Sequence, residues 1–197
     1  MNAKISDIAS RFAILEEELK QEFERGIKEK ELLFQYRIEK GKIAFQQEAK
    51  RIHKRIRMGI LTFLWESSLA SLLVAPLIYS LFVPLLILDI WLWIYQTVCF
   101  PVYGVSKVKR EKYVVLDRGA LGYLNWIERL NCNFCGYANG LMGYAREIAS
   151  RTEQYFCPIK HASRILGAHS RYHNFLEFGD AKGYLKEFEK FRDNLRT

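Results

Sequence analysis

The segment from Met58 to Ser106 contains no lysine or arginine, and its only full charges are Glu66 and Asp89. Leu, Ile, Val, Phe, Trp and Tyr fill most of it. A helix needs about 20 apolar residues to cross a bilayer, so this segment is too long for one crossing and suits two. The sequence therefore predicts a membrane protein whose residues 58–106 form a transmembrane helical hairpin.

Basic residues flank the hairpin on both sides, with Arg55 and Arg57 before it and Lys107 and Lys109 after it. Lysine and arginine near membrane ends favour the cytoplasmic side, so we expect both termini in the cytoplasm and the turn near Tyr79 to Pro84. Two alternatives remain open. The hairpin could be re-entrant without reaching the opposite face, or it could be buried in a soluble protein.

Charged groups inside a bilayer are costly and are often functional. With the turn near residue 81, Glu66 falls opposite Tyr95 and Gln96, so we expect it to form a polar contact between the helices. Asp89 lies nearer the turn, and its role stays open. A proton or ion pathway would require several hairpins arranged around both carboxylates.

Residues 1–57 are predicted to form one long amphipathic helix. Apolar residues recur at helical spacing, interrupted by a phase shift: Ile5, Ile8, Phe12, Leu15, Leu19, Phe23, Ile27, Phe34, Ile38, Phe45, Ala49, Ile52 and Ile56. Such a stripe needs a partner. We expect a coiled coil that makes the protein a homo-oligomer, with packing against the C-terminal part of the same chain as the alternative.

The net charge of +8 and the pI near 9.3 would also fit a nucleic-acid-binding protein. The densest basic runs, however, lie at the two membrane edges, where anionic lipid headgroups explain them, and no RNA- or DNA-binding motif is present. The N-terminus lacks the apolar core of a signal peptide. Glycine-rich nucleotide loops and the G-x-S-x-G motif are also missing, so the question of enzymatic activity stays open.

Residues 107–197 are expected to form a cytosolic domain with a metal site. Cys132 and Cys135 form a C-x2-C unit that is followed by Gly136, and Cys157 and His161 lie further along the chain. Because cytosolic thiols stay reduced, such a set favours a metal over a disulfide. Zinc closed by Cys3His is the first expectation. An iron-sulfur cluster and a redox dithiol of Cys132 and Cys135 are the alternatives.

Three carboxylates could support that metal site from behind its ligands: Glu128, Glu147 and Glu153. Glu147 and Arg151 are four residues apart, as are Glu153 and Cys157, so each pair shares a helix face. Pro158 should end the helix that contains Ala145 to Tyr155.

The two segments that contain these cysteines resemble the zinc knuckles of zinc-ribbon and treble-clef domains, and the resemblance covers only these short segments. The stretches NCNFCGYANG and YAREIASRTEQYFCPIKHA resemble a signature of uncharacterised bacterial membrane proteins. The resemblance implies a bacterial inner-membrane protein but no activity.

Two further patterns concern packing. Gly136, Gly140 and Gly143 have a small-residue spacing that would let another helix approach closely. Residues 184–195 are predicted to form a short amphipathic helix with Leu185, Phe188, Phe191 and Leu195 on one side.

Taken together, the sequence predicts an all-α membrane protein: an amphipathic helix over 1–57, the hairpin over 58–106, and a Cys3His domain over 107–197. The expected function is that of an oligomeric, membrane-anchored scaffold or adaptor for an unidentified protein partner, with a structural zinc site. A membrane redox component built on the same four residues is the alternative.

Overall fold

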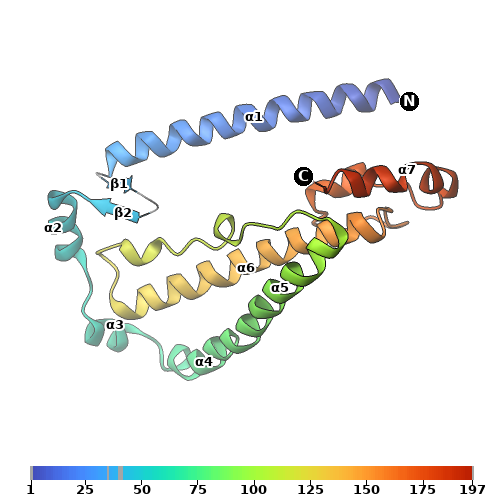
Figure 1. Ribbon diagram of the computed structural model, residues 1–197. Helices are drawn as coiled ribbons and strands as arrows, with labels where there is room; N and C mark the ends of the chain where they lie inside the picture. Colours follow the sequence, from blue (N-terminus) through green and yellow to red (C-terminus); the bar gives the residue numbers. More distant parts are fainter. Residues whose placement is uncertain (1, 35, 40–41, 197) are drawn as a thin grey trace. The chain divides into compact units, whose positions relative to one another are not determined.

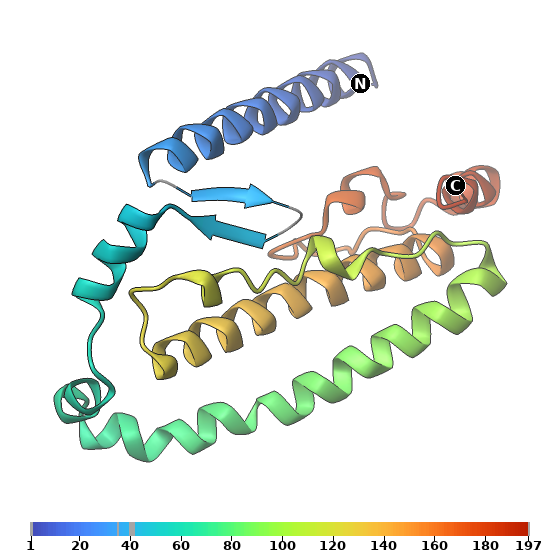
Figure 2. The same ribbon diagram turned by 60° about the vertical axis from the view of Figure 1, so that its left-hand side comes forward.

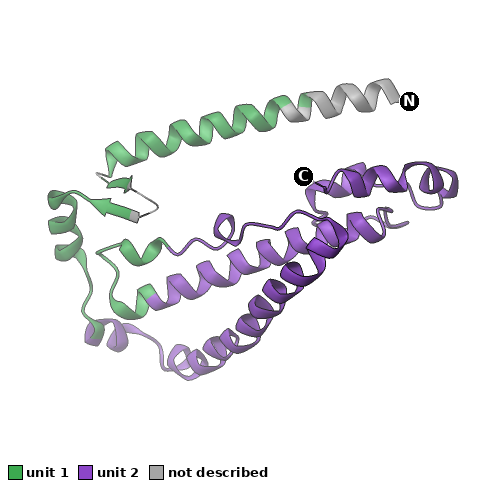
Figure 3. Cartoon of the chain, viewed as in Figure 1, with its two compact units in different colours: residues 1–60, 117–129 green, residues 61–116, 130–197 purple. Residues whose placement is uncertain are grey.

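A computed structural model describes residues 2–34, 36–39 and 42–196, without the side chains of residues 2–10, 12, 13, 39 and 42. The described chain is mostly helical (Figure 1). It divides into two compact units (Figure 3). Unit 1 comprises residues 1–60 and 117–129, and unit 2 comprises residues 61–116 and 130–197.

Unit 1 corrects the prediction of one helix over 1–57. Helix α1 covers Asn2–Leu33, strands β1 (Tyr36–Glu39) and β2 (Lys42–Phe45) form an antiparallel hairpin, and helix α2 covers Gln47–Ile56. Tyr36 pairs with Phe45 and Ile38 with Ile43. Aromatic and β-branched pairs of this kind stabilise strands. The period-2 alternation of residues 36–45 was the signal that the helical interpretation missed.

Helix α1 exposes the apolar residues that were expected to form a coiled coil. Leu15, Leu19 and Phe23 are exposed, whereas the side chains of Ile5, Ile8 and Phe12 lie outside the described residues. Oligomerisation through this helix therefore stays a prediction.

Three consecutive apolar helices follow, and all but the first residue of this stretch belong to unit 2: α3 (Ile60–Glu66), α4 (Leu69–Ser80) and α5 (Phe82–Tyr103). The Ser68 hydroxyl caps α4 by accepting a hydrogen bond from the backbone N–H of Ser71. At the expected hairpin turn the backbone of Leu81 keeps right-handed helical angles. The predicted turn near Tyr79 to Pro84 is therefore wrong, because α4 continues into α5 as one apolar segment, Leu69–Tyr103, that is long and apolar enough to cross a membrane.

The chain then passes back along α5 before helix α6 (Trp126–Phe156) begins. We call residues 104–116 the return segment; it includes the 3-10 turn η1 (Arg110–Lys112), and the turn η2 (Arg118–Ala120) follows in unit 1. Contacts between α5 and α6 advance in the same direction, from Phe82 with Phe134 to Tyr103 with Tyr155. The two helices are therefore parallel, and the return segment runs opposite to both (Figure 2).

The C-terminal part packs on the end of α6. That helix ends at Phe156, two residues before Pro158, as expected. The turn η3 (Ser170–Asn174) and helix α7 (Ala181–Asp193) come next. Helix α7 confirms a helix in this part of the chain, but Leu185 is exposed and Leu195 lies beyond the end of the helix, so the predicted apolar side is only partly formed. The Gln154 side-chain amide donates a hydrogen bond to the Phe191 carbonyl at 2.8 Å, which fastens α7 to α6.

The core of unit 2 lies between α5, the return segment and α6. Its buried residues come from all three elements and from the C-terminus: Phe100, Val105, Val108, Tyr137, Leu141, Tyr144, Ile148 and Leu195. Gly140 of α6 faces the backbone of the return segment so closely that a Cβ atom there would lie 2.5 Å from the Tyr113 carbonyl oxygen. The glycine pattern thus admits an extended segment instead of the expected helix.

Candidate membrane-binding face

Helix α5 has an inner side that carries all of its polar contacts. The backbone N–H of Val108 donates to the Gln96 side-chain oxygen at 3.0 Å, and the Gln96 amide donates to the Tyr144 hydroxyl. Tyr95 and Thr152 share a hydrogen bond of 3.0 Å. These contacts attach α5 to the return segment and to α6.

Asp89 lies on the same side and has an ionic partner. Arg110 of η1 donates to both carboxylate oxygens, at 3.0 and 2.6 Å, and the Tyr137 hydroxyl donates at 3.0 Å. The hydrogen bond to Asp89 is the main reason why the pKa of Arg110 is raised. The sequence analysis left the role of Asp89 open. Asp89 and Gln96 are seven residues apart and therefore lie on one helix face, and this spacing could have indicated that α5 makes its polar contacts on that face.

The opposite side of α5 is apolar, uncharged and exposed. We call it the outer face, and it consists of seven residues at helical spacing: Val83, Ile87, Ile90, Trp91, Ile94, Val98 and Val102. Ile87 and Trp91 are 62% and 68% exposed. Soluble proteins rarely expose contiguous apolar surfaces of this kind, so this face requires a lipid or a protein partner.

Helices α3 and α4 extend the exposed apolar surface. Helix α4 has no buried residue, and Leu73 is 80% exposed. In α3, Trp65 is 91% exposed. Glu66 ends α3 and is exposed, so the predicted contact of Glu66 with α5 is not formed among the described residues.

The predicted metal ligands do not come together within the described chain. Cys132 and Cys135 lie near the beginning of α6, whereas Cys157 follows its end. A helix rises about 1.5 Å per residue, so Cys132 and Cys157 are separated by about 37 Å along the axis. No group of three or more His, Cys, Asp or Glu side chains among the described residues could hold a metal ion. The structure therefore gives no support to a Cys3His centre within one chain, and the identity of any metal stays a prediction.

The three carboxylates expected behind the metal ligands have other partners. Glu128 and Asn125 cap α6 reciprocally, since each backbone N–H donates to the other side chain, at 2.8 and 3.0 Å, which is a capping box. Glu153 pairs with His169 at 2.9 Å.

Glu147 joins three parts of unit 2. Its carboxylate accepts hydrogen bonds from Arg151 at 2.9 Å and from Arg171 at 2.7 Å. Arg151 in turn donates to the Ser106 carbonyl and hydroxyl of the return segment. The helical spacing predicted the pair of Glu147 and Arg151. The contacts with Arg171 and Ser106 could not be predicted, because these residues are distant in sequence.

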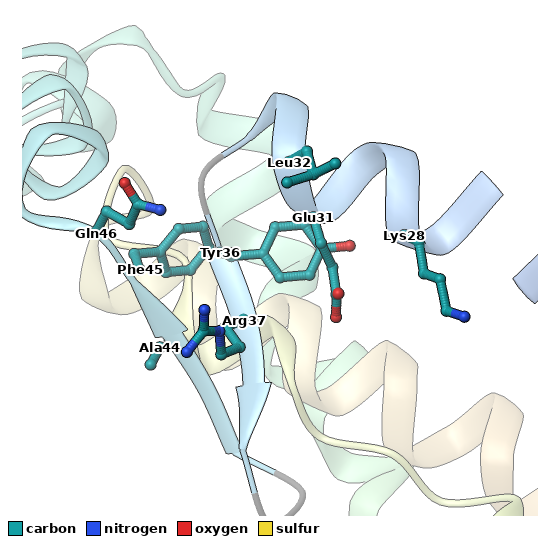
Figure 4. Close-up of a pocket in the computed structure, with 8 residues that line it drawn as sticks. All are labelled: Lys28, Glu31, Leu32, Tyr36, Arg37, Ala44, Phe45 and Gln46. Carbon is teal, nitrogen blue, oxygen red and sulfur yellow. The ribbon is translucent and has the colours of Figure 1, made fainter. Parts of the chain in front are cut away.

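Unit 1 contains an open cavity of about 580 Å³ between the end of α1 and the β-hairpin (Figure 4). Tyr36 and Phe45 form one wall, with ring centroids 5.9 Å apart, and Lys28 and Glu31 lie on the helix side. These groups offer aromatic surface and opposite charges. They contain no cysteine, serine or histidine that could act as a nucleophile or base.

Comparisons with protein-family models, curated proteins and solved structures gave no match for this chain. The functional argument therefore rests on the chain's own geometry.

Proposed function

We propose that the protein is a membrane-bound scaffold whose α4 and α5 lie in the plane of the membrane interface, with the outer face immersed in lipid. One observation carries the proposal: α5 has a continuous apolar side that is exposed, while its opposite side, which holds Gln96 and Asp89 among apolar residues, is covered by the return segment and α6. An apolar helix face that stays exposed on a folded unit can bury itself at the headgroup and acyl-chain boundary.

The packing of unit 2 favours an in-plane position over a crossing. The apolar segment Leu69–Tyr103 has 35 residues, or about 52 Å as a helix, which exceeds the roughly 30 Å of hydrocarbon in a bilayer. Helix α6 and the return segment contact α5 from Phe82 to Tyr103.

A crossing by α5 would carry those two elements into the hydrocarbon with it. Both elements carry charged residues. The return segment contains Lys107, Lys109, Glu111 and Lys112, and α6 contains Arg146 and Glu147. Each lysine or arginine at the bilayer centre costs about 3 kcal/mol. An in-plane position avoids this cost and keeps these charges on the water side, where the lysines can also meet anionic headgroups.

The scaffold role rests on an apolar surface that lies outside unit 2. Exposed apolar residues of α1, including Leu19, Phe23 and Leu32, offer a surface for a protein partner or for a second copy. The proposed activity is therefore attachment of a partner to the membrane through α1.

A vesicle flotation experiment tests the lipid-binding part. The test variant carries Ile87→Asp, Ile90→Asp and Ile94→Asp on the outer face. The control variant carries three aspartates at exposed apolar positions of unit 2 that lie outside the apolar helices, namely Leu166, Phe178 and Leu185. Both variants and the wild type are purified in detergent and reconstituted with phosphatidylcholine and phosphatidylglycerol.

We expect the control variant to float with the vesicles as the wild type does, and the outer-face variant to lose most of its vesicle-bound fraction. Burial of one such side chain contributes about 1–2 kcal/mol, so three together change partitioning by at least about a hundredfold. Equal flotation of the two variants would refute the assignment of the outer face to lipid.

A further inference from the structure

All three cysteines of the C-terminal region lie on one side of α6. Successive helical residues are rotated by about 100°, so Cys132, Cys135 and Cys157 fall within about 60° of one another. The backbone N–H of Cys157 still donates to the Glu153 carbonyl at 2.7 Å, so the helical geometry extends to that residue. None of the cysteines forms a disulfide, and Cys135 is exposed.

Cys132 and Cys135 alone provide half of a zinc site. Helical residues three apart have Cβ atoms about 5–6 Å apart, which lets both sulfurs bind one ion. A closed structural zinc site takes four ligands. Because α6 places Cys157 about 37 Å from Cys132, and no group of three or more His, Cys, Asp or Glu side chains among the described residues could hold a metal ion, we look to another chain for the missing two ligands.

The other end of α6 is less open to a second copy. Arg146 donates to the Gly167 carbonyl at 2.6 Å, and His169 contacts Glu153, so the segment around residues 167–169 lies against that half of the helix. Near the cysteine pair, Cys135, Asn139 and Met142 are exposed, and α4 reaches this part of the helix at Asn131, which accepts a hydrogen bond from the Tyr79 hydroxyl. A second α6 can therefore approach most directly at Cys132 and Cys135.

We propose that one zinc ion joins two copies of this chain through Cys132 and Cys135 of each. The four thiols lose four protons on binding, and the product is a tetrahedral tetrathiolate zinc site on a two-fold axis. Cys157 and His161 have no part in it. This proposal is independent of lipid binding, although a joined pair of chains would also bring two outer faces to the same membrane.

Metal stoichiometry of the full chain in detergent tests the proposal. The reduced protein is loaded with zinc, freed of excess metal and assayed for zinc per chain, and its molar mass is measured by light scattering. A parallel sample receives Co²⁺, whose visible spectrum reports tetrahedral thiolate ligation. The variants are Cys132→Ser and Cys135→Ser, with Cys157→Ser and Cys99→Ser as matched controls.

We expect one zinc per two chains and a tetrathiolate cobalt spectrum in the wild type and in both controls. Cys132→Ser and Cys135→Ser should lose at least nine tenths of the bound metal. The absence of bound zinc in the wild type, one zinc per chain, or loss of zinc in Cys157→Ser would each overturn the proposal. Flotation of Cys132→Ser with vesicles is measured separately, so failure of the zinc site and failure of lipid binding are distinguishable.

Discussion

Replacement of Gly140 by alanine should weaken unit 2, because the return segment occupies the space that a side chain would need. An alanine Cβ would lie 2.5 Å from the Tyr113 carbonyl oxygen and 2.9 Å from the Val114 Cα. Both neighbours are backbone atoms, so they cannot rotate away. Overpacking of this kind costs about 1–3 kcal/mol.

Gly136→Ala provides a matched control one helical turn earlier. A Cβ atom there would lie 3.6 Å from the Val115 carbonyl oxygen, which is an ordinary contact. Both substitutions gain about 1 kcal/mol of helix propensity, so this gain cancels in the comparison. The free energy of unfolding of Gly140→Ala should be lower than that of Gly136→Ala by about 1–3 kcal/mol.

Urea unfolding in detergent micelles, followed by circular dichroism, measures this difference. Equal stabilities of the two variants, or a more stable Gly140→Ala, would show that the return segment does not lie against this side of α6. The core of unit 2, in which the return segment packs against α6, would then be refuted.

Three further predictions concern the polar contacts. Asp89→Asn removes the charge that Arg110 faces and should lower the free energy of unfolding by about 2 kcal/mol, a value between those for exposed and buried ion pairs. The control Glu111→Gln, at an exposed position in the same turn as Arg110, should change the free energy of unfolding by less than about 0.5 kcal/mol. Urea unfolding of both variants measures these changes. Asn125→Ala removes half of the capping box and should lower the melting temperature, with a loss of about 1–2 kcal/mol; an unchanged melting temperature would refute the cap. Burial and the hydrogen bond to Asp89 raise the pKa of Tyr137 to about 12, so the unfolded chain releases this proton first as the pH rises above about 10. Stability should be full below about pH 10 and fall by up to about 1.4 kcal/mol per pH unit towards pH 12, and Tyr137→Phe should lessen that slope in melting curves taken across this range.

The sequence predicted the elements whose signal is local. The apolar segment of α4 and α5, the end of α6 before Pro158 and the presence of a helix at α7 all follow from composition or helical spacing. The pairing of Glu147 with Arg151 follows from their separation by one helical turn.

The errors arose where the outcome depends on distant residues. A turn was expected near Tyr79 to Pro84, but Leu81 remains helical. Tyr95 and Gln96 of α5 have their partners in α6 and in the return segment, and not in Glu66 of α3. The cysteine motif offers thiol and imidazole groups that suit zinc, and zinc binding stays a prediction. The motif gave no indication that one continuous helix separates Cys132 and Cys135 from Cys157, and this helix keeps the two parts of the motif apart.

Depth measurement along the apolar segment tests the in-plane position most directly. Single tryptophans are placed at Leu73, Ile87 and Val102, with the four native tryptophans replaced by phenylalanine, and their quenching by lipids brominated at defined depths is compared in vesicles. An in-plane segment predicts nearly equal, shallow depths at all three positions. In a crossing segment, Leu73 and Val102 would lie about 20 Å from Ile87 along the axis, so a deep central tryptophan between two shallow ones would contradict the in-plane account.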